Sequence, residues 1–245
     1  AALGTGGAIE EILRRAAQVL GILSQELGVA VAPGLDHAVL ERLELVRVSS
    51  ERLLVVLTLE SRMVRTLFLE VPSAVAADAI DHVGRVLNER LGGLSLAAIR
   101  ATVSDRLRDA GSDVGHDQLF NIFVERREDL FDTKPEGSLM LGSARPLADQ
   151  PEFASNGRMR DLLDLTERRD LLEGAFAAHR KRGLTITIGS ENKDPSLSEF
   201  TLVTASYRWG DLTGVVGVLG PTRMPYEKVI GLVEHTSRLV EGLLT

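Results

Sequence analysis

Residues that could carry out catalysis or bind a metal ion are few and scattered in this sequence. Its five histidines fall in predicted loops and helices without the spacing of a ligand pair, and Asp78 and His82, four residues apart on one predicted helix, would need a third ligand from elsewhere. There is no cysteine, no Gly-x-Ser-x-Gly nucleophile turn and no His-Glu-x-x-His helix. We therefore expect no catalytic residue, no metal and no cofactor, and we predict that the protein is not an enzyme.

Two glycine-rich stretches have a superficial likeness to phosphate-binding loops. Gly4 to Gly7 and the pattern Gly214-x-x-Gly217-x-x-Gly220 both lack the order of strand, glycine loop and helix, and neither has the lysine of a P-loop. Glycines between β-branched residues are instead typical of a buried strand that another backbone approaches closely. We interpret the second stretch as part of such a strand.

Polar side chains stand out in two tight loops of the second half of the chain. Glu191 and Asn192 follow one predicted strand, and Arg223 and Tyr226 follow another, so each needs a partner beside an apolar element. Our structural hypothesis is an ion pair between Glu191 and Arg223 that links the two loops. The functional alternative is that these residues line a pocket for a small molecule, as in a sensor domain.

The second of these loops lies in a joint between a strand and a helix, Gly217 to Tyr226. Val215 to Leu219 has the composition of a buried strand, and Gly220-Pro221 ends it. Thr222 can cap the following turn and Pro225 suits a helix start, after which the hydrophobic period changes from 2 to about 3.6. The sequence therefore predicts a strand, a rigid corner and a docked helix.

The remaining elements follow from hydrophobic periodicity and turn residues. Helices are predicted over residues 8–27, over three segments between 74 and 131, over 158–182 and over 226–244. Strands are predicted over residues 43–48, 52–59, 63–71, 138–142, 184–188, 200–207 and 212–219. The first three strands are expected to form an antiparallel meander.

These elements predict an α+β fold with one antiparallel sheet whose two halves are separated by an insertion. The main groups of strands occur before residue 72 and after residue 183, with helices between them, which describes a small sensor-like domain. We place the two parts of the sheet domain at residues 1–72 and 153–245. The mainly helical insertion is placed at residues 73–152.

The inserted helices carry a large amount of apolar surface. The helix predicted over 117–131 contains three of the seven phenylalanines of the chain, all within a stretch of twelve residues. These rings can build the core of the insertion itself, or some of them can cover a partner subunit. The candidates for a dimer interface are Leu87, Leu91, Leu119, Phe120 and Phe123.

Composition limits the classes of function. The net charge of −7 argues against a large uniform basic face for nucleic acid within this segment. No stretch approaches the roughly 20 apolar residues of a membrane span, and no signal peptide opens the sequence. We expect a globular, cytoplasmic protein with no membrane contact.

Several segments together resemble the HrcA-type family of bacterial heat-inducible transcription repressors. They are Gly217 to Ile230, Ile188 to Asn192, Leu202 to Tyr207 and Gly142 to Phe153, the last ending in Gln-Pro-Glu-Phe, with a weaker likeness at Leu87 to Leu96. Pro225 stands where the family commonly has an acidic residue. The residues of the structural signature are Glu191, Asn192, Gly217, Gly220, Pro221, Thr222, Arg223 and Tyr226.

The resemblance implies a protein of three parts: an N-terminal winged-helix DNA-binding domain, a GAF-like domain, and a dimerisation domain inserted into the GAF-like domain. This chain resembles the last two parts without the first. The resemblance also implies a homodimer that binds an inverted-repeat operator through the missing domain and represses chaperone genes. The chaperonin GroEL is implied as the partner that keeps the repressor active.

The main alternative is a stand-alone GAF-like sensor of a small molecule. A sensor needs a polar-lined cavity over its sheet, whereas an architectural domain fills that space with leucine, valine and phenylalanine. The resemblance itself implies no ligand for the GAF-like sheet, because a fold does not determine a function.

Overall fold

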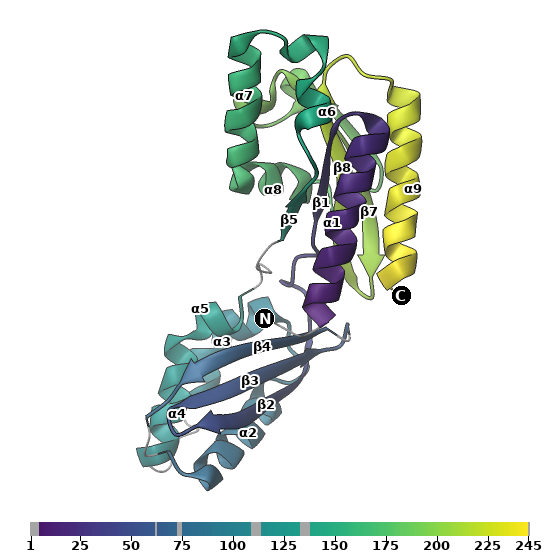
Figure 1. Ribbon diagram of the computed structural model, residues 1–245. Helices are drawn as coiled ribbons and strands as arrows, with labels where there is room; N and C mark the ends of the chain where they lie inside the picture. The colour runs from purple at the N-terminus through teal and green to yellow at the C-terminus, as the bar shows by residue number, and fades with distance from the viewer. Residues whose placement is uncertain (1–4, 62, 73–74, 109–113, 133–137, 245) are drawn as a thin grey trace. The chain divides into compact units, whose positions relative to one another are not determined.

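The computed structural model describes residues 5–61, 63–72, 75–108, 114–132 and 138–244. The chain divides into two compact units, which are described separately below with the labels of Figure 1. The split unit comprises Ala8–Pro33 and Glu136–Thr245. The inserted unit comprises Gly34–Pro135 together with Ala1–Gly7.

The split unit is built on an antiparallel sheet. In the part of the chain that the structure describes, this sheet has five strands in the order β5-β1-β8-β7-β6, with bounds β1 Leu27–Val31, β5 Leu139–Leu141, β6 Thr185–Ile188, β7 Phe200–Trp209 and β8 Leu212–Pro221. The central strands β7 and β8 form a hairpin that turns at Gly210, whose φ of 57° favours glycine. Most side chains of both strands are buried, because helices cover both faces of the sheet.

On one face of this sheet lie α1 (Thr5–Ser24) and α9 (Tyr226–Leu244), as Figure 1 shows. Leu20 of α1 and Val229 of α9 pack together against Val203 and Val218 of the central strands. The other face carries α6 (Arg145–Ala148), α7 (Asn156–Glu167), α8 (Arg169–Ala177) and the 3-10 turns η1 (Pro151–Phe153) and η3 (Pro195–Leu197), while η2 (Gly189–Glu191) follows β6. Among the described helices, none is both long enough and apolar enough to cross a membrane.

The inserted unit contains its own antiparallel sheet and a set of helices. Its described elements are β2 Leu40–Ser49, β3 Arg52–Leu59, β4 Val64–Glu70, α2 Ala77–Leu91, α3 Leu96–Leu107, α4 Val114–Glu125 and α5 Arg127–Leu130. The strand order is β2-β3-β4. Along β3, Leu53, Val55 and Leu57 are fully buried while Leu54 and Val56 are only half-buried. This alternation shows that the helices cover one face of the sheet.

Helix α2 is bonded directly to the edge strand β2. The side-chain amide of Asn88 accepts a hydrogen bond from the N–H of Leu43 at 2.8 Å and donates to the carbonyl oxygen of Leu43 at 2.6 Å. The backbone groups that an edge strand would otherwise leave unpaired are thereby satisfied at this position. Strands β2 to β4 therefore belong with the helices that follow them in the chain.

The five-stranded sheet is interrupted by an insertion between β1 and β5, as predicted. The assignment of the early meander to this sheet is wrong, because the meander pairs only with itself among the described strands. Its alternating side chains bury against the helices after residue 76 rather than against the later strands. The structure accordingly divides the chain near residues 34 and 135, which differs from the expected boundaries at 72 and 152. The α+β class with antiparallel strands is confirmed.

Two local differences concern the ends of helices. The predicted helix over residues 8–27 ends at Ser24, and β1 begins at Leu27, where all five strand residues are buried and show no alternation. The predicted helix over 158–182 consists of α7 and α8, which meet at Arg168. A short, fully buried strand cannot be distinguished from a helical segment by periodicity, which explains why β1 was not predicted.

Candidate functional site

The joint predicted from the sequence lies where β8 ends and α9 begins. β8 extends to Pro221 and α9 starts at Tyr226, so the predicted strand, corner and helix are all present. Gly217 lies opposite Thr204 of β7, and a Cβ atom there would overlap the carbonyl oxygen of Val203 and lie 2.9 Å from the Cα of Thr204. Glycine is therefore required because the β7 backbone approaches this position too closely for a side chain.

Asn192 connects three backbone segments beside this joint. Its Nδ2 donates to the carbonyl oxygens of Gly189, Leu197 and Phe200 at 3.0, 3.1 and 2.9 Å. Its Oδ1 accepts a hydrogen bond from the Thr187 hydroxyl at 2.7 Å. One amide thus links the end of β6, turn η3 and the start of β7, and the arrangement is structural because all of these bonds stay within the protein.

The predicted ion pair between Glu191 and Arg223 is not formed among the residues that the structure describes. Both side chains are exposed, and Glu191 instead accepts a hydrogen bond from the N–H of Ile188 at 2.8 Å. The carboxylate thereby closes its own turn at η2. The prediction was wrong because a partner three residues away satisfies Glu191 more readily than a side chain from another loop.

Tyr226 and its neighbours stabilise the corner itself. The phenol of Tyr226 donates to the carbonyl oxygen of Thr222 at 2.7 Å and lies 3.4 Å from the Thr201 hydroxyl. Pro221 is buried, whereas Thr222 and Arg223 are exposed. The corner between Pro221 and Tyr226 is therefore closed by a side chain of the helix that follows it.

A buried carboxyl group lies directly under the joint. Glu26, between α1 and β1, is 1% exposed, and a Cβ atom on Gly220 would overlap its Oε2 and lie 2.7 Å from its Cδ. The pKa of Glu26 is raised to about 7, chiefly because the group is buried; the hydrogen bond from Gln150 acts to lower the pKa, and the charge of Glu152 acts to raise it. Sequence reasoning missed this residue, whose only signal is its place directly before the apolar run of β1.

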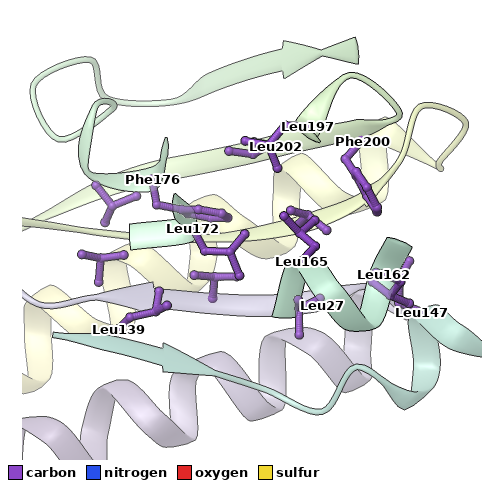
Figure 2. Packing of buried hydrophobic residues seen from close by; sticks show 14 of the residues in the cluster. Leu27, Leu139, Leu147, Leu162, Leu165, Leu172, Phe176, Leu197, Phe200 and Leu202 are labelled. Carbon is purple, nitrogen blue, oxygen red and sulfur yellow. The ribbon is translucent and has the colours of Figure 1, made fainter. Parts of the chain in front are cut away.

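The space between the sheet and helices α7 and α8 is filled by apolar side chains, as Figure 2 shows. The buried residues in this cluster include Leu162, Leu165, Leu172, Phe176 and Leu202. This filling is the arrangement expected of an architectural domain rather than of a sensor. The sensor interpretation therefore gains no support from the core of the split unit.

A pocket of about 390 Å³ lies at the edge of this core, between α7 and η3. Its polar lining residues already bond to one another: Arg158 lies 3.3 Å from Glu199, and Arg168 donates to the Ser196 hydroxyl at 2.6 Å. Its wall contains both acidic and basic side chains. The lining therefore selects no particular class of ligand.

The predicted dimer-interface residues lie in the core of the inserted unit. Leu87, Leu91, Leu119, Phe120 and Phe123 are at most 3% exposed within the single chain. Of the two interpretations of the apolar helices, their burial fits a core of the unit's own. Asp78 and His82 lie on α2, and the described residues contain no group of three or more side chains able to hold a metal ion.

The exposed apolar residues of the inserted unit lie on the opposite side of its sheet. Val46 of β2 is 46% exposed and Phe68 of β4 is 58% exposed. Leu54 of the middle strand β3 pairs with Val46 on one side and with Phe68 on the other, so the three residues form a row across the sheet. Val56 of β3 lies on the same side of the sheet as Leu54. We call these four residues the outer face, and sequence reasoning missed it because strand pairing determines which residues align.

Comparisons with known proteins agree on one family. Residues 10–230 match the family described as HrcA protein C terminal domain. The chain is 39% identical over 234 residues to the heat-inducible transcription repressor HrcA of Chlorobium phaeobacteroides (strain BS1), covering 92% of this chain and 66% of that protein. It is 36% identical over 249 residues to the repressor HrcA of Chlorobium limicola, covering 98% and 69%.

A solved structure shares the fold. The crystal structure of a hypothetical protein matches with a TM-score of 0.59 at 17% identity, covering 97% of this chain and 68% of that chain. At this identity, the likeness concerns the fold alone. The chain spans about two thirds of the length of the curated relatives that it matches.

Proposed function

The chain belongs to the HrcA family of heat-inducible transcription repressors, and from this membership we propose that it forms the regulatory and dimerisation region of such a repressor. The observation that carries the proposal is the outer face of the inserted unit, a set of exposed and half-buried apolar side chains on a sheet whose other side is packed by helices (Figure 1). Apolar side chains gathered in this way mark protein contact sites. A second copy of the chain is the proposed partner.

The charges at the two ends of the outer face fit a second copy. At one end, Arg42 forms an ion pair with Glu44 at 2.9 Å. At the other end, Arg52 lies opposite Glu70 and its guanidinium is 4.5 Å from the centre of the Phe68 ring. Each end of the outer face carries one acidic and one basic side chain. Whichever end of a second copy meets it, an acid of one copy can therefore face a base of the other. A two-fold contact requires such self-complementarity.

Replacing Phe68 with glutamate should convert the dimer to monomers. The substitution places one carboxylate from each copy in an apolar contact, and we expect the dissociation constant to rise by about 100-fold or more. The solution mass by light scattering measures the effect: the wild-type chain should show twice its 26.6 kDa, and Phe68→Glu should show the single value.

The matched control is Leu163→Glu, which changes a similarly exposed leucine (52%, against 58% for Phe68) on α7 of the split unit. This variant should remain a dimer. A dimeric Phe68→Glu variant would contradict the outer face as the contact, and a monomeric wild-type chain at micromolar concentration would contradict the proposed dimerisation altogether.

In the complete repressor, we propose that this dimer sets the separation of two DNA-reading parts on an inverted-repeat operator of chaperone genes. A two-fold operator matches a two-fold protein, and the spacing of its half-sites is a geometric property of the dimer. The acidic balance of this chain, −7, supports the proposal that the DNA contacts belong to the part of the relatives that it does not cover. The family resemblance supports GroEL as the partner that keeps the repressor active.

Gel-shift titration with an inverted-repeat operator separates the two roles. A full-length relative should shift the operator, whereas this chain should need at least about 100-fold more protein, because its 35 acidic side chains outnumber its 28 basic ones and repel the phosphates. The control is the same relative shortened to the region that matches this chain. Comparable operator affinity for the shortened and full-length proteins would refute this division of roles.

A further inference from the structure

Three segments of the split unit meet at the buried side chain of Glu26. The first is the end of α1, where the Ser24 hydroxyl accepts the N–H of Glu26 at 3.2 Å and Gln25 has a φ of 66°. The second is the turn before η1, which contributes Gln150, and the third is the end of β8, which contributes Gly220. The last two segments belong to the stretches in which the sequence resembles its family most specifically.

The carboxyl group has little to stabilise a negative charge. Among the described residues its one hydrogen-bond donor is Nε2 of Gln150 at 3.2 Å, and the same nitrogen donates to the carbonyl oxygen of Gln25 at 2.7 Å. No basic side chain in the described part of the chain lies within ion-pair distance of it. The end of β8 contributes Gly220 and the joint after it contributes Met224, while the turn at η1 adds the like charge of Glu152.

An ionised carboxylate in this position is therefore unfavourable. A buried charge without a cation or several hydrogen bonds costs free energy, so the neutral form is preferred in the folded protein. The pKa of Glu26 rises from 4.5 to about 7, chiefly because of burial. Both forms of the group are then populated near neutral pH, which is unusual for a glutamate.

We propose that Glu26 is a proton-dependent switch at this crossing. With the carboxyl group protonated, the end of α1, the Gln150 turn and the joint before α9 pack closely together. Loss of the proton places an uncompensated charge between the three segments and favours their local opening. This role is separate from the proposed dimerisation, because every group involved lies within the split unit of one chain.

The direction of the pH dependence follows from the two pKa values. A group that binds its proton more tightly in the closed form than in the open form stabilises the closed form fully below the open-form pKa. This stabilisation is lost as the pH rises through the closed-form value, and it changes no further above it. The window for Glu26 is therefore between 4.5 and about 7.

Hydrogen exchange of the intact chain tests the proposal. After correction for the intrinsic exchange rate, protection of the last turn of α1 and the first turns of α9 should fall by up to about tenfold per pH unit between pH 5 and pH 7, then level off. Glu26→Gln, which cannot ionise, should show no such fall. Glu234→Gln, the same change at an exposed position of α9, should behave as the wild-type chain does.

Two results would overturn the switch: protection in the wild-type chain that stays constant from pH 5 to pH 8, or a fall that persists in Glu26→Gln. If Glu26→Gln does not fold, carbon NMR of the glutamate carboxyl groups in the wild-type chain decides the question. One carboxyl resonance should titrate near pH 7. Midpoints below pH 5 for every glutamate would refute the proposal.

Discussion

Gly28→Ala will unfold the split unit, with an expected loss of more than about 4 kcal/mol in the free energy of unfolding. A Cβ atom at Gly28 would overlap the carbonyl oxygen of Ala17 and lie 2.7 Å from the backbone nitrogen of Gly21. Both atoms belong to the backbone of α1, so no rotation of a side chain can relieve the overlap. Helix α1 would have to leave the sheet, which would expose Leu13 and Leu20.

Urea unfolding followed by tryptophan fluorescence measures this effect in the split unit alone, because the single tryptophan, Trp209, is 9% exposed at the end of β7. The matched control is Gly231→Ala in α9, where an added Cβ meets no atom within 4 Å. That variant should gain about 1 kcal/mol from helix propensity. Equal urea midpoints for Gly28→Ala and the wild-type chain would show that α1 does not pack as described.

Asn192→Ala is expected to destabilise the same unit by about 3 kcal/mol. The substitution removes the donor for the carbonyl oxygens of Gly189, Leu197 and Phe200 and the acceptor for the Thr187 hydroxyl. Leaving such groups without a partner costs more than the net value of the bonds themselves. The fluorescence midpoint in urea again gives the magnitude.

A second substitution at the same position separates the donor role from the acceptor role. Asn192→Asp keeps an acceptor for Thr187 but directs a carboxylate oxygen at three carbonyl oxygens, so it should be at least as destabilising as the alanine variant. Asn156→Ala, an exposed asparagine at the start of α7, is the control and should change stability by less than about 0.5 kcal/mol. A tolerated Asn192→Asp would mean that the amide hydrogens are not what connects the three segments.

These residues show why the joint is structural. Asn192, Tyr226 and Gly217 satisfy or approach backbone groups of the protein itself, and the space above the sheet is filled by side chains such as Leu165 and Phe176. A sheet that supports two layers of helices in this way is suited to keeping a fixed geometry. Within the split unit, Glu26 is the position at which we propose that this packing depends on a proton.

The sequence by itself determined the elements that depend on neighbouring residues. The change of period at Tyr226, the break at Gly220-Pro221 and the apolar run from Leu53 to Leu57 in β3 are local patterns, and the corresponding helix, corner and strand are all observed. The family resemblance was also available from sequence, because it rests on specific local segments such as Gly217 to Ile230. Comparison with the family confirms it over residues 10–230.

Only the tertiary structure decided which surfaces these elements share. Periodicity shows that a strand has an apolar face, but not whether that face meets the next helix or a strand 150 residues away. The tertiary contacts place β2 to β4 in the inserted unit and bury Phe123 while Phe68 stays exposed. They also bring Glu26 next to Gly220. The physical reason is that burial and pKa depend on the sum of contacts from distant segments, and those contacts exist only once the chain has folded.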